Sequence, residues 1–181
     1  MSTLAIIASI VGGVHVALFG FALFRPSACR SIIESFPRSI WPARILLMIA
    51  LPWAAWMLVS NPPLLGSIWL TKLVYIATPI AFVLIMMFVS ELLAPRVLGG
   101  LLLLISNPIL METRFHDSLW RLVVSVMIYI WIVAGIMLVL HPYRFRQIGS
   151  YFLKNSTRSR MVGVSGLGVA ALLFVLALSV Y

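Results

Sequence analysis

The chain has 181 residues, of which 63% are hydrophobic and 9% are charged, and its mean hydropathy is +1.14. Its 13 Lys/Arg and 4 Asp/Glu side chains cannot coat a water-soluble surface, because soluble domains carry roughly 25% charged residues. The single cysteine, Cys29, excludes a disulfide scaffold, and the apolar composition excludes disorder and collagen. The composition therefore predicts a polytopic membrane protein.

Six stretches approach the ~20 mostly apolar residues that a spanning helix needs. In chain order they cover residues 4–24, 45–59, 68–92, 97–111, 119–140 and 162–181. The fourth stretch is short and contains Pro108, so on hydropathy alone it could cross the membrane or turn back. We expect an all-α transmembrane bundle of six spans.

The basic residues decide how the spans are threaded. They gather in a loop between the first two spans and a loop between the last two, and short loops rich in Lys and Arg stay on the cytoplasmic side. Both loops share that side only if an even number of spans separates them, so the fourth stretch must cross. This threading places ten of the 13 basic residues, Arg96 among them, inside and leaves Lys72, Arg114 and Arg121 outside. It predicts a bacterial cytoplasmic (inner) membrane protein with both termini outside.

The two basic loops also match each other. A shift of 116 residues aligns Pro26 with Pro142, Arg30 with Arg146, Ile32 with Ile148, Phe36 with Phe152 and Arg44 with Arg160. In each loop the apolar residues recur at helical spacing with arginines on the other face, which predicts a short amphipathic helix lying in the membrane interface. We therefore expect a parallel internal repeat, with a first hairpin unit over residues 1–60, a central pair of spans over 61–118 and a second hairpin unit over 119–181.

Basic side chains at a membrane interface are candidates for contact with the phosphates of anionic lipids. In these loops the candidates are Arg30, Arg38, Arg44, Arg144, Arg146, Lys154, Arg158 and Arg160. Nucleic acid is not an expected partner, because the charges are spread over three membrane-bound turns.

The most polar segment, residues 111–121, lies at the predicted outer boundary. With a residue near the outer end of the third span it forms a predicted outer cluster, made of Lys72, Glu112, Arg114, His116, Asp117 and Arg121. Such a set could bind a headgroup or a substrate, or perform acid–base work with His116 and Asp117. Its spacing matches no catalytic motif, so charge pairing across an extracellular turn is the favoured interpretation.

No metal or other cofactor is expected. One cysteine cannot form a thiolate cluster. Two haem ligands must lie at nearly one depth, yet the spans place His141 about 15 Å deeper than His15 at 1.5 Å per residue. His116 lies at the outer boundary, displaced from both.

Small residues recur at helical spacing on the first and last spans, and close helix contact in lipid uses such stripes. The predicted packing residues are Ser9, Gly13, Ala17, Gly166 and Ala170. They join spans of this chain to each other or dock another subunit.

The leading functional hypothesis is a non-catalytic structural or accessory subunit of a larger membrane assembly, with lipids and other membrane subunits or a second copy as partners. A carrier or channel for a small neutral or lipidic solute is the first alternative. A membrane enzyme with a site near His116 and Asp117 is the second, and it is less expected than a non-catalytic role. Only His15 is ionisable at mid-depth, which argues against ion-coupled transport.

Overall fold

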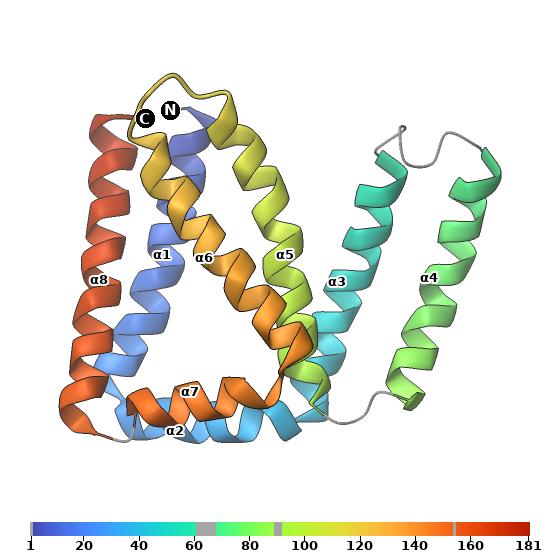
Figure 1. The fold of residues 1–181 in the computed structure, drawn as a ribbon, viewed down its shortest axis with the longest axis horizontal. Coiled ribbons are helices and arrows are strands. Elements are labelled where there is room, and N and C mark those ends of the chain that lie inside the picture. The colour runs from blue at the N-terminus through green and yellow to red at the C-terminus, as the bar shows by residue number, and fades with distance from the viewer. Residues whose placement is uncertain (1, 61–67, 89–91, 154) are drawn as a thin grey trace.

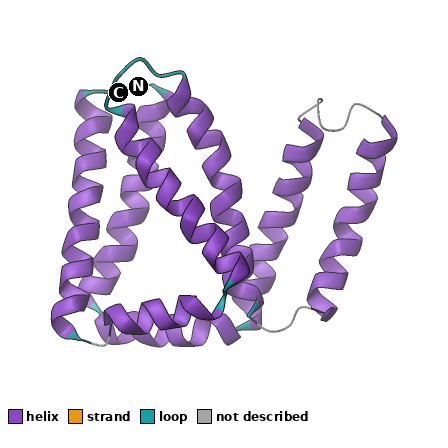
Figure 2. Cartoon of the chain, viewed as in Figure 1, coloured by secondary structure: helices purple, strands orange, loops and turns teal. Residues whose placement is uncertain are grey.

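The computed structural model describes residues 2–60, 68–88, 92–153 and 155–181. Within these ranges the chain is helical, with short turns and no strand, as Figure 2 shows. The described elements are α1 (Thr3–Phe24), α2 (Pro26–Ser35), the 3-10 turn η1 (Phe36–Arg38), α3 (Ile40–Ser60), α4 (Ile68–Phe88), α5 (Leu93–Arg114), α6 (Arg121–Leu140), α7 (Tyr143–Leu153) and α8 (Ser156–Ser179). Six of these helices, α1, α3, α4, α5, α6 and α8, are long and apolar enough to cross a membrane, as the sequence predicted.

The short fourth stretch, residues 97–111, lies within the long helix α5. It has 22 residues, as many as α1, although Pro108 lies inside it. Pro95 lies in its first turn, where a backbone amide needs no helical partner. Arg96 also lies in this first turn rather than in a loop between spans. Figure 1 shows α5 running the whole height of the bundle, so α2 and α7 lie at the same end.

The two short helices lie across the ends of the long ones because the backbone changes direction in the same way at two places. The residue that follows α1 is Arg25, with backbone angles φ −133° and ψ 63°, and the residue that follows α6 is His141, with φ −130° and ψ 64°. A proline follows each residue, and proline disfavours the helical conformation in the residue before it. The chain therefore leaves each long helix sideways, and α2 and α7 pack against each other at that end (Figure 1).

Small residues bring α1 and α8 together. On α8 a Cβ added to Gly166 would overlap the ring of Phe19, and one added to Gly163 would lie 2.9 Å from the Cβ of Leu23. From the other side, a Cβ on Gly12 would lie 3.2 Å from the ring of Phe174. Because lipid tails are as apolar as the helices, such close backbone approach is the main source of helix association in a bilayer.

A second close crossing joins α5 to α6. A Cβ on Gly99 would lie 2.6 Å from the carbonyl oxygen of Gly135, and a Cβ on Gly135 would lie 2.9 Å from the carbonyl oxygen of Gly99. Real Cβ atoms do not approach other atoms this closely, so the two backbones can cross here only because both residues are glycine.

The helices α3 and α4 form an arm at one side of the molecule (Figure 1). α3 packs on α5 through a cluster of buried residues that includes Ala43, Leu47 and Leu101. α4 packs mainly on α3, and none of its apolar stretch is buried, compared with 44% of the apolar stretch of α5. This arm therefore presents nearly all of α4 to its surroundings.

The glycine crossing gives a matched pair of variants. Gly99→Leu should force α5 and α6 apart and lower the free energy of unfolding by about 1–3 kcal/mol, the usual cost of overpacking. Gly100→Leu is the control, because a Cβ at Gly100 has no neighbour within 4 Å. Thermal unfolding of the two purified variants in detergent measures the difference. Equal melting temperatures would contradict the close crossing.

Candidate functional site

The candidate site is the layer formed by α2, η1 and α7. Within it Phe36 and Phe145 lie with their ring centroids 5.3 Å apart, and a Cβ on Gly149 would overlap the side chain of Ile33. Phe36 contacts Phe145, and three residues earlier on α2 Ile33 meets Gly149, which is four residues later on α7. The two short helices α2 and α7 therefore cross in antiparallel directions. We call this the interfacial layer, and it holds four of the twelve basic residues of the described chain.

The predicted lipid-phosphate residues in and beside this layer have different surroundings. Arg30 donates from Nε to the carboxylate of Glu34 at 2.8 Å. The guanidinium of Arg44 lies 5.5 Å from the ring centroid of Trp41, and that of Arg158 lies 4.5 Å from the ring centroid of Tyr151.

The remaining predicted residues fall into three groups. Arg38 and Arg146 line one cleft. Arg144 is exposed on α7, and Arg160 borders a shallow hollow on the first turns of α8. Lys154 lies outside the described residues.

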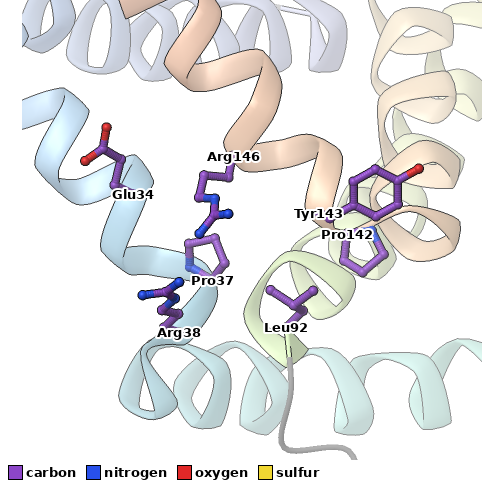
Figure 3. A pocket seen from close by; sticks show the side chains of 7 residues that line it. All are labelled: Glu34, Pro37, Arg38, Leu92, Pro142, Tyr143 and Arg146. Atoms are coloured by element: carbon purple, nitrogen blue, oxygen red, sulfur yellow. The ribbon is translucent and has the colours of Figure 1, made fainter.

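The cleft between η1 and the start of α7 has a volume of about 440 Å³. It is lined by Glu34, Pro37, Arg38, Leu92, Pro142, Tyr143 and Arg146. Figure 3 shows the side chain of Arg146 directed toward the Pro37 ring, with the guanidinium of Arg38 close beside that ring. The cleft thus brings together two of the predicted arginines, one from each basic loop.

Local structure fixes the walls of the cleft. Pro37 and Pro142 are buried, and their rings hold the backbone at the end of α2 and at the start of α7. Leu92 has φ 55°, a left-handed conformation that branched residues rarely adopt, where the chain enters α5. The rim is polar, because Arg38, Tyr143 and Arg146 are exposed.

The charge of the cleft is positive. Glu34 is the only carboxylate that lines it, and its carboxylate points away from the two guanidinium groups and is bonded to Arg30 (Figure 3). Within the described chain neither Arg38 nor Arg146 makes an ion pair. Glu91, which precedes Leu92 in the sequence, lies outside the described residues. As far as the described residues go, the two guanidinium groups are therefore available to an anion.

The sole cysteine belongs to the same layer. Cys29 lies on α2 and is partly exposed, and burial raises the pKa of its thiol above the ordinary value of 9.0. A raised pKa keeps the thiol protonated near neutral pH, where it reacts slowly, because the thiolate is the nucleophile.

Half of the predicted outer cluster forms a closed turn. Arg121 donates to the backbone carbonyls of Arg114 and His116, and the Nδ1 atom of His116 accepts from the amide of Ser118. The His116 ring packs edge-on against Tyr181, with centroids 5.3 Å apart. The hydroxyl of Tyr181 donates to the carbonyl of Trp120 at 2.7 Å. Burial raises the pKa of Tyr181.

The three other members of the outer cluster are not drawn into this turn. Glu112 and Asp117 are exposed, and neither makes an ion pair with a described residue. Lys72 lies on α4, which Figure 1 shows on the far side of α3 from the turn. No described hydrogen bond joins His116 to Asp117. The geometry is that of a helix-capping turn.

The predicted small residues divide between two surroundings. Gly166 and Ala170 on α8 are buried. On α1, Gly13 and Ala17 are exposed, and a Cβ on Gly13 would have no neighbour within 4 Å. Ser9 donates its hydroxyl to the carbonyl of Ala5 within its own helix at 2.8 Å.

The histidines lie apart from one another. His15 is buried on α1, where Nδ1 lies 2.9 Å from the carbonyl oxygen of Val11 and the ring stacks on Trp131 with centroids 6.0 Å apart. His141 ends α6 at the interfacial layer, and His116 lies in the turn at the opposite end. No three His, Cys, Asp or Glu side chains of the described ranges are placed to hold a metal ion.

Sequence reasoning selected Arg38 and Arg146 but did not single out the residues that shape their cleft. Pro37, Leu92, Pro142 and Tyr143 come from three separate segments, so only the fold brings them together. The available signal was the proline beside each arginine-rich turn. Comparisons of the chain with protein-family models, curated proteins and solved structures gave no match.

Proposed function

We propose that the chain is an integral membrane protein whose six long helices cross a bilayer while α2 and α7 lie in one interface. The support is the large apolar surface of the long helices, which is unfavourable in water. Large apolar side chains are exposed along the long helices, including Trp69 at 80%, Phe88 at 78% and Ile10 at 61%. Lipid tails are as apolar as these side chains, so contact between the two is not unfavourable.

The orientation that we propose places the interfacial layer on the cytoplasmic side of a bacterial inner membrane and both termini outside. Ten of the 13 basic residues precede, follow or belong to the helices of this layer or begin α5 beside it. Lys72, Arg114 and Arg121 belong to the opposite ends of the long helices. An excess of Lys and Arg in short loops marks the cytoplasmic side.

We also propose that α1–α2–α3 and α6–α7–α8 are two copies of one unit. Four helix ends support this repeat. α1 ends at Phe24 and α6 at Leu140, while α3 begins at Ile40 and α8 at Ser156, and both intervals equal the 116-residue shift of the sequence match. The matching backbone angles at Arg25 and His141 follow the same shift.

Contacts between equivalent residues support a two-fold axis. Residues that a two-fold rotation exchanges can touch each other only near its axis. The 116-residue shift pairs His15 with Trp131, whose rings stack, and Ile33 with Gly149, which meet where α2 crosses α7. The first pair lies within the long helices and the second in the interfacial layer, so the proposed axis runs along the bundle.

The role that we propose is that of a non-catalytic subunit that meets a partner within the membrane. The contrast between two neighbouring glycines carries this proposal. Gly12 packs on α8, but Gly13 and Ala17 are small exposed residues on α1, in a stretch that also carries Ile10 and Leu18, which are 61% and 62% exposed. Exposed small residues let another helix approach closely. The uncovered helix α4 offers a second surface.

The two alternative functions have less support. A carrier needs a solvated path, but apolar side chains fill the centre between α1, α5, α6 and α8, among them Val11, Ile128 and Leu173. An enzyme at the outer boundary needs convergent reactive groups, whereas His116 and Arg121 serve the turn that contains them.

The role of Gly13 on α1 is tested by substituting each of the two neighbouring glycines with leucine. Gly13→Leu should abolish co-purification of a partner in mild detergent and leave the melting temperature of the isolated chain unchanged, because the added side chain meets nothing in this chain. Gly12→Leu is the matched control and should lower the melting temperature, because it faces Phe174. If Gly13→Leu leaves association intact, the Gly13 face of α1 contacts lipid and the subunit proposal loses its support.

The orientation is tested with the native thiol. A membrane-impermeant maleimide should leave Cys29 unmodified in intact cells and modify it in inverted membrane vesicles. The reaction should be slow at neutral pH and should still accelerate above pH 9, because the raised pKa delays formation of the thiolate. Mass spectrometry of the purified chain measures the labelled fraction. Labelling in intact cells would reverse the proposed orientation.

A further inference from the structure

Two arginines distant in the sequence are directed into one cleft by the crossing of α2 and α7. Packing of Phe36 on Phe145 holds η1 against the start of α7. Arg38 lies two residues after the first phenylalanine, and Arg146 lies directly after the second. The contact that joins the two helices therefore also sets the separation of the two guanidinium groups, which Figure 3 shows on either side of Pro37.

The chemistry of the cleft fits a phosphate group. Arginine presents planar N–H donors that match phosphate oxygens in pairs, and it is more weakly hydrated than lysine. Arg38 and Arg146 are exposed and make no ion pair within the described ranges, and the nearby Glu34 is bonded to Arg30. The Tyr143 side chain on the same wall adds a hydroxyl that can donate or accept.

The walls favour a lipid over a soluble phosphate. Pro37, Pro142 and Leu92 give the cleft an apolar side, and Leu92 immediately precedes the long helix α5. A volume of about 440 Å³ accepts a headgroup but not two acyl chains. The chains would remain in the bilayer beside α5, while the phosphate lies at the level of the interfacial layer.

We propose that the cleft formed by Arg38, Arg146, Tyr143 and the two prolines is a binding site for the phosphate-bearing headgroup of an anionic phospholipid. This inference rests on the proposed membrane placement and goes beyond it, because it assigns one defined site to two of the eight predicted lipid-contacting residues. General attraction of a basic surface to anionic lipid would involve all of them alike.

The test compares two charge-matched double variants of the full chain. Arg38→Gln with Arg146→Gln removes both arginine charges from the cleft, and Arg144→Gln with Arg158→Gln removes the same charge from α7 and the first turn of α8. Native mass spectrometry measures the affinity for the first phosphatidylglycerol added to delipidated protein, with phosphatidylcholine as the neutral lipid. The cleft variant should lose affinity for phosphatidylglycerol at least about tenfold, as expected when charge-assisted hydrogen bonds are removed. The control variant should stay within about twofold of the wild type, because surface charges outside a contact contribute little.

A third variant separates hydrogen-bond geometry from charge. Arg38→Lys with Arg146→Lys keeps the charge and the fold of the layer but loses the planar donors, so its affinity should fall between those of the wild type and the glutamine variant. It also keeps the test decisive if the glutamine variant does not fold. Wild-type affinity in the lysine variant would contradict the site, since charge alone would then suffice.

Two other outcomes would overturn the proposal. Equal losses in the cleft and control variants would show attraction to the whole basic layer rather than to one site. Displacement of phosphatidylglycerol by inorganic phosphate would assign the cleft to a soluble phosphate. Either result can occur while Cys29 labelling still places the layer on the cytoplasmic side, so failure of this site is distinguishable from failure of the proposed orientation.

Discussion

The antiparallel crossing of α2 and α7 is the constraint on which the rest of the structure depends. Each short helix connects two long ones, so the crossing fixes where four long helices meet the interfacial layer. Gly149 has no side chain, and Ile33 fills the space that a Cβ would need. This contact sets how closely the two helices approach, and the packing of Phe36 on Phe145 sets their register. The cleft between Arg38 and Arg146 is a consequence of that register.

Above this layer the long helices are held by shape rather than by polar contacts. In the proposed bilayer placement no hydrophobic force acts between the helices, so contact area and close backbone approach would hold them together. The chain provides them at the Gly99–Gly135 crossing and where Gly163 and Gly166 receive Leu23 and Phe19. α4 packs on α3, but no residue of its apolar stretch is fully buried. The arm of α3 and α4 is therefore the part of the molecule with the most surface left for lipid or a partner.

The sequence predicted the features that depend on local pattern. Hydropathy located the six long helices, and the arginine and proline pattern located α2 and α7. Boundaries were less accurate: α3 begins at Ile40 rather than at residue 45, and α8 begins at Ser156 rather than at residue 162. The residues before each apolar stretch, Arg44 and Arg158 among them, already belong to the helix, because backbone hydrogen bonds form regardless of hydropathy.

The candidate site could be predicted only in part because it depends on long-range packing. Composition identifies Arg38 and Arg146 as interfacial, but nothing local indicates that they share a cleft with Leu92 and Tyr143. Similarly, spacing placed Gly13 and Gly166 on stripes of one kind, whereas the fold buries the second and exposes the first. The sequence placed Lys72 at the same membrane depth as the outer turn, but its helix, α4, belongs to the arm on the other side of α3.

The crossing itself can be measured by a single disulfide in native membranes. Under the proposed two-fold axis, the contact between Phe36 and Phe145 has an equivalent between Cys29 and Phe152, because each number shifts by 116. Phe152→Cys should therefore form an intrachain disulfide with the native Cys29 under mild oxidation, and Phe145→Cys, at the other end of α7, should not. Proteolysis followed by non-reducing mass spectrometry identifies the bond. A bond to Phe145→Cys without one to Phe152→Cys would mean that the helices run parallel and would contradict the account.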